Sequence, residues 1–242
     1  MIADNLGKTL LDRTLVIVLA HPNDELKTQI LNECLSTITF PKLLSCNYTV
    51  PVETQNMTDW MVYSKENPIL YEKDFTIYDI FLSRWFINEH GEKVYLSHKF
   101  DNQYAVSFLI KNAISFAKHL KKDFIHMVNY DFNITDEVLV ENTLDLIDND
   151  LVVYNCAPNT FNRPACSTAF FSGRISTIEL FFNQFDNIDQ YYFYKHEGHF
   201  LEEKFYSCMK RIVPKLKEKD LGELSTRCNI ARHAIVADFV YE

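Results

Sequence analysis

The sequence predicts an α/β fold in which an open, mostly parallel β-sheet is flanked by helices. Short apolar runs alternate with segments whose apolar residues recur at helical spacing, and this alternation is typical of a parallel sheet. Polar residues follow directly after two of the apolar runs, where open α/β sheets bind ligands. The 242 residues, 47% of them hydrophobic, suffice for one domain over residues 1–242, as a whole protein or as a piece of a longer one.

The first apolar run, Leu15–Ala20, is continuous, as expected for a strand that is buried on both faces. His21 and Pro22 end this strand, and Asn23 or Asp24 is a suitable cap for the helix that follows. Six apolar residues of that helix fall at helical spacing: Leu26, Ile30, Leu31, Cys34, Leu35 and Ile38.

Two short strands are predicted next, at residues 43–48 and 60–63, and Pro68 closes the loop after the second one. Residues 69–100 mix aromatic with polar side chains. They include a predicted hairpin turn at residues 88–92.

The clearest helix spans residues 103–120, and its basic C-terminal end suits the helix dipole. A strand at 124–130 and a helix from 135 to about 147 are predicted after it. The remaining predicted elements are a strand at 151–154, a strand at 169–171 that leads into residues 172–174, and helices at 176–185 and 200–216.

Composition excludes several classes of protein. The 24 Lys and Arg against 33 Asp and Glu give a net charge of −9, which argues against a nucleic-acid partner. No apolar run approaches the roughly 18 residues of a membrane span, and residues 1–8 do not form a signal peptide. The six cysteines contain no C-x-x-C pair, so reduced thiols are expected. We therefore expect a cytoplasmic protein.

Glycine is scarce in this chain. Only five glycines are present, whereas average usage is about 7% of residues. Neither a G-x-G-x-x-G fingerprint nor a Walker loop can be assembled from them. If the protein binds a nucleotide diphosphate, a group other than a glycine-rich loop must neutralise the phosphates.

Asp131 and Asn133 offer such a group, because they follow the strand at 124–130 directly. A carboxylate and a nearby oxygen ligand suit a hard cation such as Mg²⁺ or Mn²⁺, which completes its coordination shell with phosphate oxygens. The alternative is an ordinary strand-end turn, where Asp and Asn are common.

The order of the elements resembles the GT-A class of nucleotide-sugar glycosyltransferases, and in particular short glycosyltransferase-like proteins of viral and marine microbial origin. The resemblance runs through most of residues 14–210. The segments that carry it are Val16–Pro22, Asp59–Leu70, Tyr104–Val106, Asn112–Ala117, Phe124–Asp131 and Phe170–Gly173.

This resemblance implies a D-x-D-like site for Mn²⁺ or Mg²⁺ at Asp131 and Asn133. Asn133 departs from the usual second Asp, which weakens the site or leaves Asp131 as its sole carboxylate. The implied donor-binding residues are His21, Pro22, Lys65, Asn102, Tyr130 and Asp131, with His21 and Pro22 near the base and Lys65 near ribose or phosphate. The implied acceptor side consists of Ser172, Gly173 and Arg174.

Transfer of the sugar with inversion needs a general base that takes the proton of the acceptor hydroxyl. Enzymes of this class often carry an acidic pair at the start of a late helix, and Glu202 and Glu203 resemble that pair, with Glu203 preferred. The alternative is that both acids simply favour the first turn of a helix. His196 and His199 stand one residue short of a zinc-protease spacing.

Two other functions compete with this interpretation. Residues 20–25 resemble the opening segment of zinc-dependent N-acetylglucosaminyl deacetylases, which makes His21 and Asp24 zinc ligands but replaces the expected base by Asn23. A non-catalytic carbohydrate-binding protein is the third hypothesis. It rests on the 14% aromatic content, concentrated in Phe181, Phe182, Phe185 and Tyr191–Tyr194, although aromatic stripes are more often core.

The predicted function is therefore metal-assisted transfer of a hexosyl or deoxyhexosyl group. The donor is a nucleotide-diphosphate sugar and the acceptor is a hydroxyl group, such as that of a glycan.

Overall fold

A computed structural model describes residues 10–66, 68, 103–158, 160–161, 163–193 and 200–230 of the chain. It also gives the backbone of four short strands between residues 70 and 101. No helix in these described parts combines the length and apolar character that a membrane span requires.

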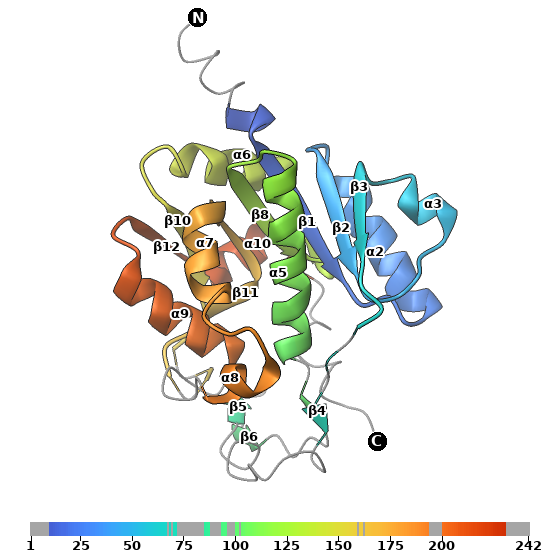
Figure 1. Cartoon of the computed structure of the whole chain (residues 1–242). Coiled ribbons are helices and arrows are strands. Elements are labelled where there is room, and N and C mark those ends of the chain that lie inside the picture. Colours follow the sequence, from blue (N-terminus) through green and yellow to red (C-terminus); the bar gives the residue numbers. More distant parts are fainter. Residues whose placement is uncertain are drawn as a thin grey trace, which may run out of the picture.

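The centre of the fold is a seven-stranded sheet (Figure 1). From one edge to the other it consists of β12 (Leu216–Asp220), β10 (Leu151–Asn155), β11 (Cys166–Arg174), β8 (Phe124–Asn129), β1 (Thr14–Ala20), β2 (Lys42–Cys46) and β3 (Trp60–Tyr63). Neighbouring strands are parallel, except that β11 runs antiparallel to both β8 and β10. The predicted α/β fold class, an open, mostly parallel sheet flanked by helices, is confirmed. Its likeness to the GT-A class stays a prediction.

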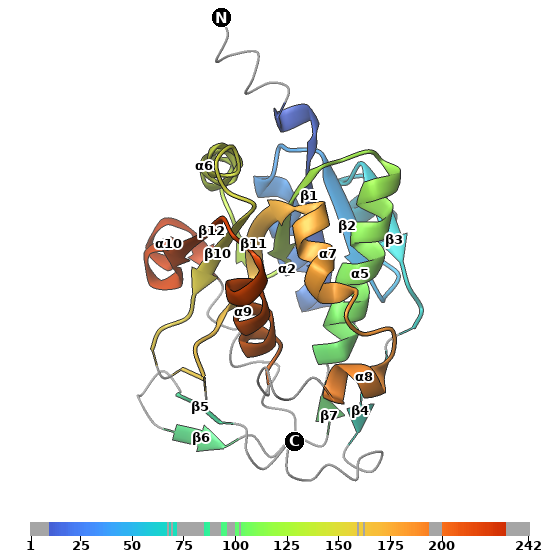
Figure 2. The ribbon, with the colours of Figure 1, turned by 60° about the vertical axis from the view of Figure 1, so that its left-hand side comes forward.

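Helices cover both faces of this sheet (Figure 2). One face packs against α5 (Gln103–His119), α7 (Ile175–Phe182) and α9 (Leu201–Ile212), and the other against α2 (Glu25–Thr37), α6 (Asp136–Asp145) and α10 (Leu221–Arg227). β1 shows why both faces need cover. Leu15 and Ile17 enter one hydrophobic cluster, Val16 and Val18 enter the other, and all four are fully buried.

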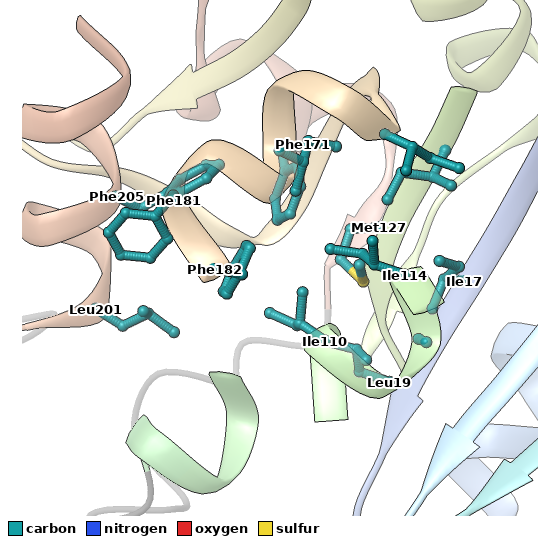
Figure 3. Close-up of a cluster of buried hydrophobic side chains, with 14 of the residues drawn as sticks. Ile17, Leu19, Ile110, Ile114, Met127, Phe171, Phe181, Phe182, Leu201 and Phe205 are labelled. Atoms are coloured by element: carbon teal, nitrogen blue, oxygen red, sulfur yellow. The ribbon is translucent and has the colours of Figure 1, made fainter. Parts of the chain in front are cut away.

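Aromatic side chains fill the core under α7 and α9 (Figure 3). The ring of Phe205 lies 4.9 Å from that of Phe171 and 5.3 Å from that of Phe181, centroid to centroid. Phe182, Phe185 and Tyr191 belong to the same cluster and are buried with it. These aromatic residues are core rather than a carbohydrate-binding surface. The side chains of residues 192–194 lie outside the described set.

Short elements complete the fold. They are α3 (Val52–Gln55), α8 (Ile188–Phe193), and three two-stranded ribbons: β9 (Phe132–Asn133) with β13 (Asn229–Ile230), β4 (Leu70–Tyr71) with β7 (Phe100–Asp101), and β5 (Trp85–Ile87) with β6 (Lys93–Tyr95). The β5–β6 pairing is that of the predicted hairpin, whose turn at 88–92 lies outside the described residues. Figure 1 shows the β4 and β5–β6 elements beyond the carboxyl ends of the parallel strands.

The structure differs from the prediction in the last third of the chain. The helix predicted at 200–216 ends at Ile212, because a residue that precedes a proline disfavours helical backbone and Pro214 follows shortly. β12 then forms from a charged segment for which no strand was predicted. This composition suits β12, which is an edge strand with β10 as its only partner in the sheet.

A polar network lies inside the sheet at β8. The ring nitrogens of His126, a fully buried residue, hydrogen-bond to Ser172 Oγ at 2.7 Å and to Thr143 Oγ1 at 2.9 Å. Asn142 donates to Ser172 Oγ and accepts from the hydroxyl of Tyr154, both at 2.9 Å. Burial lowers the pKa of His126 to about 3, so its ring is neutral in the folded protein.

This buried histidine predicts a pH-dependent stability. The pKa of His126 is 6.5 in the unfolded chain and about 3 in the folded protein. Between these two pH values, the unfolded chain binds a proton on His126 and the folded protein does not. Stability therefore falls as the pH falls through that window, by up to about 1.4 kcal/mol per pH unit. Urea titrations at several pH values measure how the free energy of unfolding depends on pH. In His126→Gln, the part of this dependence that comes from His126 should disappear. His119→Gln, at an exposed position, should retain it, and an unchanged slope in His126→Gln would contradict the assignment.

Candidate functional site

Several candidate residues meet at the carboxyl edge of the sheet, at the ends of β1 and β8. These two strands are parallel neighbours, and the pairing continues past β8 because the backbone N–H of Tyr130 donates to the carbonyl of Leu19 at 2.9 Å. His21 follows β1 and Asp131 follows β8. The local sequence thus brings these two residues to one edge of the sheet, where open α/β folds bind ligands.

The β1 side of this edge carries a histidine that neighbouring side chains orient. His21 Nδ1 lies 2.9 Å from Asn47 Oδ1, and its ring meets that of Tyr48 edge to face at 4.7 Å between centroids. Asn47 is buried, whereas Tyr48 is 40% exposed. Pro22 is buried beside His21, and Lys65 is exposed beyond the end of β3.

Sequence analysis missed Asn47 and Tyr48. It placed both inside a strand at 43–48, but β2 ends at Cys46. The signal that could have found them is the polar Asn47 directly after an apolar run, which is the same pattern that singled out Asp131.

Asp131 and Asn133 present oxygen atoms at the end of β8. The Oδ1 atoms of both residues are buried. No group in the described part of the chain hydrogen-bonds to Oδ1 of Asn133. The backbone here is held in place, because Asn133 pairs with Asn229 of β13 and the Cys34 thiol contacts the carbonyl of Phe132 at 3.6 Å.

These atoms fit a hard divalent cation. A buried polar atom without a hydrogen bond costs free energy, and a cation at the Asn133 oxygen would remove that cost. Carboxylate and amide oxygens are ligands that Mg²⁺ accepts, and Mn²⁺ accepts them as well. Burial, and after it the charge of Asp131, raises the pKa of the Cys34 thiol to about 12, so this nearby thiol stays protonated. Among the described residues, no group of three or more His, Cys, Asp or Glu side chains is arranged to hold a metal.

The two predicted acids at the start of α9 have different environments. Glu203 is fully buried, and its Oε1 accepts the backbone N–H of Arg163 at 2.9 Å. Its Oε2 accepts the backbone N–H of Phe200 at 3.2 Å, the reverse half of a capping box. Both oxygens of Glu203 therefore hold backbone in place.

Glu202 is the acid whose environment suits proton transfer. Its Oε1 accepts a hydrogen bond from the hydroxyl of Thr168 at 2.8 Å. Burial raises the pKa of the Glu202 carboxyl above its ordinary value, which is the direction that a general base at neutral pH requires. The sequence analysis preferred Glu203 as the candidate base. The hydrogen bonds of the two acids favour Glu202 instead.

Thr168 also relates Glu202 to the metal-binding candidates. Thr168 lies two residues before Phe170, whose partner on β8 is Val128, so it stands level with Tyr130. Adjacent strands are about 4.8 Å apart. Thr168 is on β11, the strand beside β8, so its hydrogen bond places Glu202 of α9 at the same edge of the sheet as Asp131.

The three residues predicted for the acceptor side do not lie with the others. β11 is antiparallel, so its end at Arg174 pairs with Phe124 at the start of β8, on the opposite edge. Ser172 is fully buried and bonded to His126, and Arg174 forms an ion pair with Asp150 at 3.0 Å. The sequence could not reveal the reversed direction of this strand.

The two zinc-ligand candidates of the deacetylase hypothesis have other roles in the structure. Asp24 caps α2, because its Oδ1 accepts the backbone N–H of Lys27 at 2.8 Å. The Nδ1 of His21 contacts Asn47. Asn102, His196 and His199 lie outside the described residues.

Comparisons with known proteins add little to this picture. No protein-family model and no curated protein matches the chain. A solved structure from Desulfovibrio desulfuricans G20, named a "putative nucleotide-diphospho-sugar transferase", is similar over 86% of this chain and 80% of its own, at 8% sequence identity and a TM-score of 0.46. A likeness at that score carries no argument, so the fold class rests on the strand order and the site rests on its geometry.

The different roles of the two acids predict different costs of substitution. Glu203→Ala leaves two backbone N–H groups without their acceptor and should lower the free energy of unfolding by roughly 2–4 kcal/mol. Glu202→Gln keeps an acceptor for Thr168 and should cost about 1 kcal/mol or less. Urea denaturation of both variants measures the difference. A larger loss in Glu202→Gln than in Glu203→Ala would contradict these assignments.

Proposed function

We propose that the chain is a glycosyltransferase that moves a sugar from a nucleotide-diphosphate donor to a hydroxyl group of an acceptor, with the help of a divalent cation. The observation that carries the proposal is the pair of buried oxygen atoms after the end of β8, Oδ1 of Asp131 and Oδ1 of Asn133, two residues apart in the chain. The resemblance of the element order to GT-A enzymes points the same way.

The β1 side of the edge binds the nucleotide in this proposal. Tyr48, which is 40% exposed, offers an aromatic ring for a base, and Asn47 contacts the ring of His21 beside it. Stacking on aromatic side chains accepts any base. Lys65, which is exposed after β3, can approach the ribose or a phosphate.

Asp131, with Asn133, would hold Mn²⁺ or Mg²⁺, which supplies the positive charge that the donor diphosphate needs as it leaves. This role answers the shortage of glycine, because no glycine-rich loop is present to bind the phosphates through backbone N–H groups.

Glu202 acts as the general base in the proposed reaction. Its carboxylate takes the proton of the acceptor hydroxyl, and the hydroxyl oxygen uses its electron pair to form the bond to the anomeric carbon of the sugar. The bond from that carbon to the diphosphate oxygen breaks, and the diphosphate leaves with the electron pair. The raised pKa of Glu202 makes its carboxylate a stronger base than an exposed glutamate.

Binding of nucleotides with and without Mn²⁺ tests the proposal first. Thermal unfolding of the full chain is measured against UDP, GDP, dTDP and CMP and their common sugar conjugates, because a bound ligand raises the melting temperature. One nucleotide should give a Mn²⁺-dependent increase that Asp131→Asn abolishes and Asp148→Asn, at an exposed position, preserves. No Mn²⁺-dependent increase with any nucleotide in the unmodified chain would overturn the proposal.

Turnover tests the role of Glu202. With the donor identified in that panel, Glu202→Gln should lower the rate of sugar transfer or donor hydrolysis by about 10²–10⁴-fold. The nucleotide-induced increase in melting temperature should stay the same, since Glu202 does not bind the donor in this proposal. Glu223→Gln, an exposed acid on α10, serves as the matched control. A rate in Glu202→Gln equal to that of the control would exclude Glu202 as the base.

A further inference from the structure

An open cavity of about 300 Å³ lies beside α9, on the side that faces the loop before β11. The residues that line it are Arg163, Pro164, Tyr206, Ser207, Lys210 and Arg211. Three of these six residues are cationic and none of the six is acidic. In a chain with a net charge of −9, this local charge is opposite in sign to that of the whole molecule.

The cationic residues that line this cavity are charged and lie at the surface. Arg163, Lys210 and Arg211 are all exposed, and arginine keeps its charge at any physiological pH. A hydrogen bond to Glu218 raises the pKa of the Lys210 ammonium. Glu218 also accepts hydrogen bonds from the Tyr206 hydroxyl at 2.9 Å and from Asn155 at 2.7 Å.

The cavity is connected to the acids at the start of α9. The backbone N–H of Arg163 donates to Glu203 at 2.9 Å, so the buried glutamate fixes the loop that carries one of the arginines. Tyr206 stands four residues after Glu202, on the same side of α9. A ligand in the cavity would therefore lie within about two helical turns of the proposed base.

We propose that this cavity binds a phosphate-type anion. The lining includes two arginines, one lysine and one serine, residue types whose side chains carry donors that match phosphate oxygens, and arginine binds such anions through two parallel hydrogen bonds. The further step, that the anion is a phosphate group on the acceptor, rests on the proposed function. In the proposed function, the diphosphate of the donor binds at a different site, near Asp131 and Asn133.

Binding of inorganic phosphate to the full chain tests this proposal, measured by calorimetric titration at low salt. The unmodified chain should bind phosphate, and the Arg163→Gln/Arg211→Gln double variant should lose about tenfold or more in affinity. Lys118→Gln, an exposed cation on α5, should bind as the unmodified chain does. No binding to the unmodified chain, or equal losses in the double variant and in Lys118→Gln, would overturn the proposal.

Two further probes distinguish the sources of such a phosphate. A hexose 6-phosphate represents a phosphorylated glycan, and phosphatidylcholine vesicles that contain phosphatidic acid represent a lipid phosphate. Stronger binding of one of them than of inorganic phosphate, lost in the double variant, would support the cavity and name its source.

The same double variant separates this proposal from the proposed function. It should keep the Mn²⁺-dependent increase in melting temperature with nucleotide, because both arginines lie outside the donor site. A nucleotide effect without phosphate binding would overturn the cavity proposal alone. Phosphate binding through the arginines, without a nucleotide effect in any chain, would support the anion site and remove its role toward an acceptor.

Discussion

The arrangement of the candidate site depends on the direction of one strand, β11. It is the strand that opposes both of its neighbours, and it separates β8 from β10, so its first residues reach the carboxyl edge while its last residues reach the opposite edge. Thr168 therefore stands beside the end of β8 and binds Glu202. If β11 ran parallel to β8, its last residues, up to Arg174, would lie toward that edge instead of Thr168.

β8 carries a buried hydrogen-bond network and leads into the candidate metal-binding residues. Its middle carries His126, which burial keeps neutral and which Ser172 and Thr143 hold by hydrogen bonds. Its end leads into Asp131. The buried network makes the register of β8 against β11 specific, since a slip by one residue would turn His126 to the other face of the sheet and leave its partners without hydrogen bonds. The position of Asp131 follows from that register.

Much of the fold could be predicted from the sequence, because local patterns determine it. β1 is a continuous apolar run and is fully buried, and α5 begins and ends within one residue of its prediction. β12 could not be predicted, since its charged residues form a strand only where β10 offers an edge to pair with. Strand direction has no local signal, so the sequence could not show that Ser172, Gly173 and Arg174, predicted for the acceptor side, approach the edge of the sheet opposite to Asp131.

The candidate site was predictable where local sequence patterns determine it, as the fold was. Asp131 and His21 follow apolar runs, and that pattern suffices to place them at the carboxyl edge. The difference between Glu202 and Glu203 required the structure, because both are acids in the first turn of one helix. Only the tertiary contacts separate the glutamate that binds two backbone N–H groups from the glutamate that binds the hydroxyl of Thr168.

Charge connects the scarcity of glycine with the cationic cavity. A chain with 33 acidic and 24 basic residues repels phosphates at long range, so a phosphate ligand has to be bound by local groups. Backbone N–H groups of a glycine-rich loop are one such device, and this chain lacks the glycines for it. The two candidate places that we propose have opposite chemistry. The oxygen pair at the end of β8 needs a cation before it can meet a phosphate, whereas the arginines beside α9 meet one directly. The two proposals therefore differ in a measurable way, since binding of an anion at the arginines needs no metal, whereas binding of a diphosphate at Asp131 and Asn133 does.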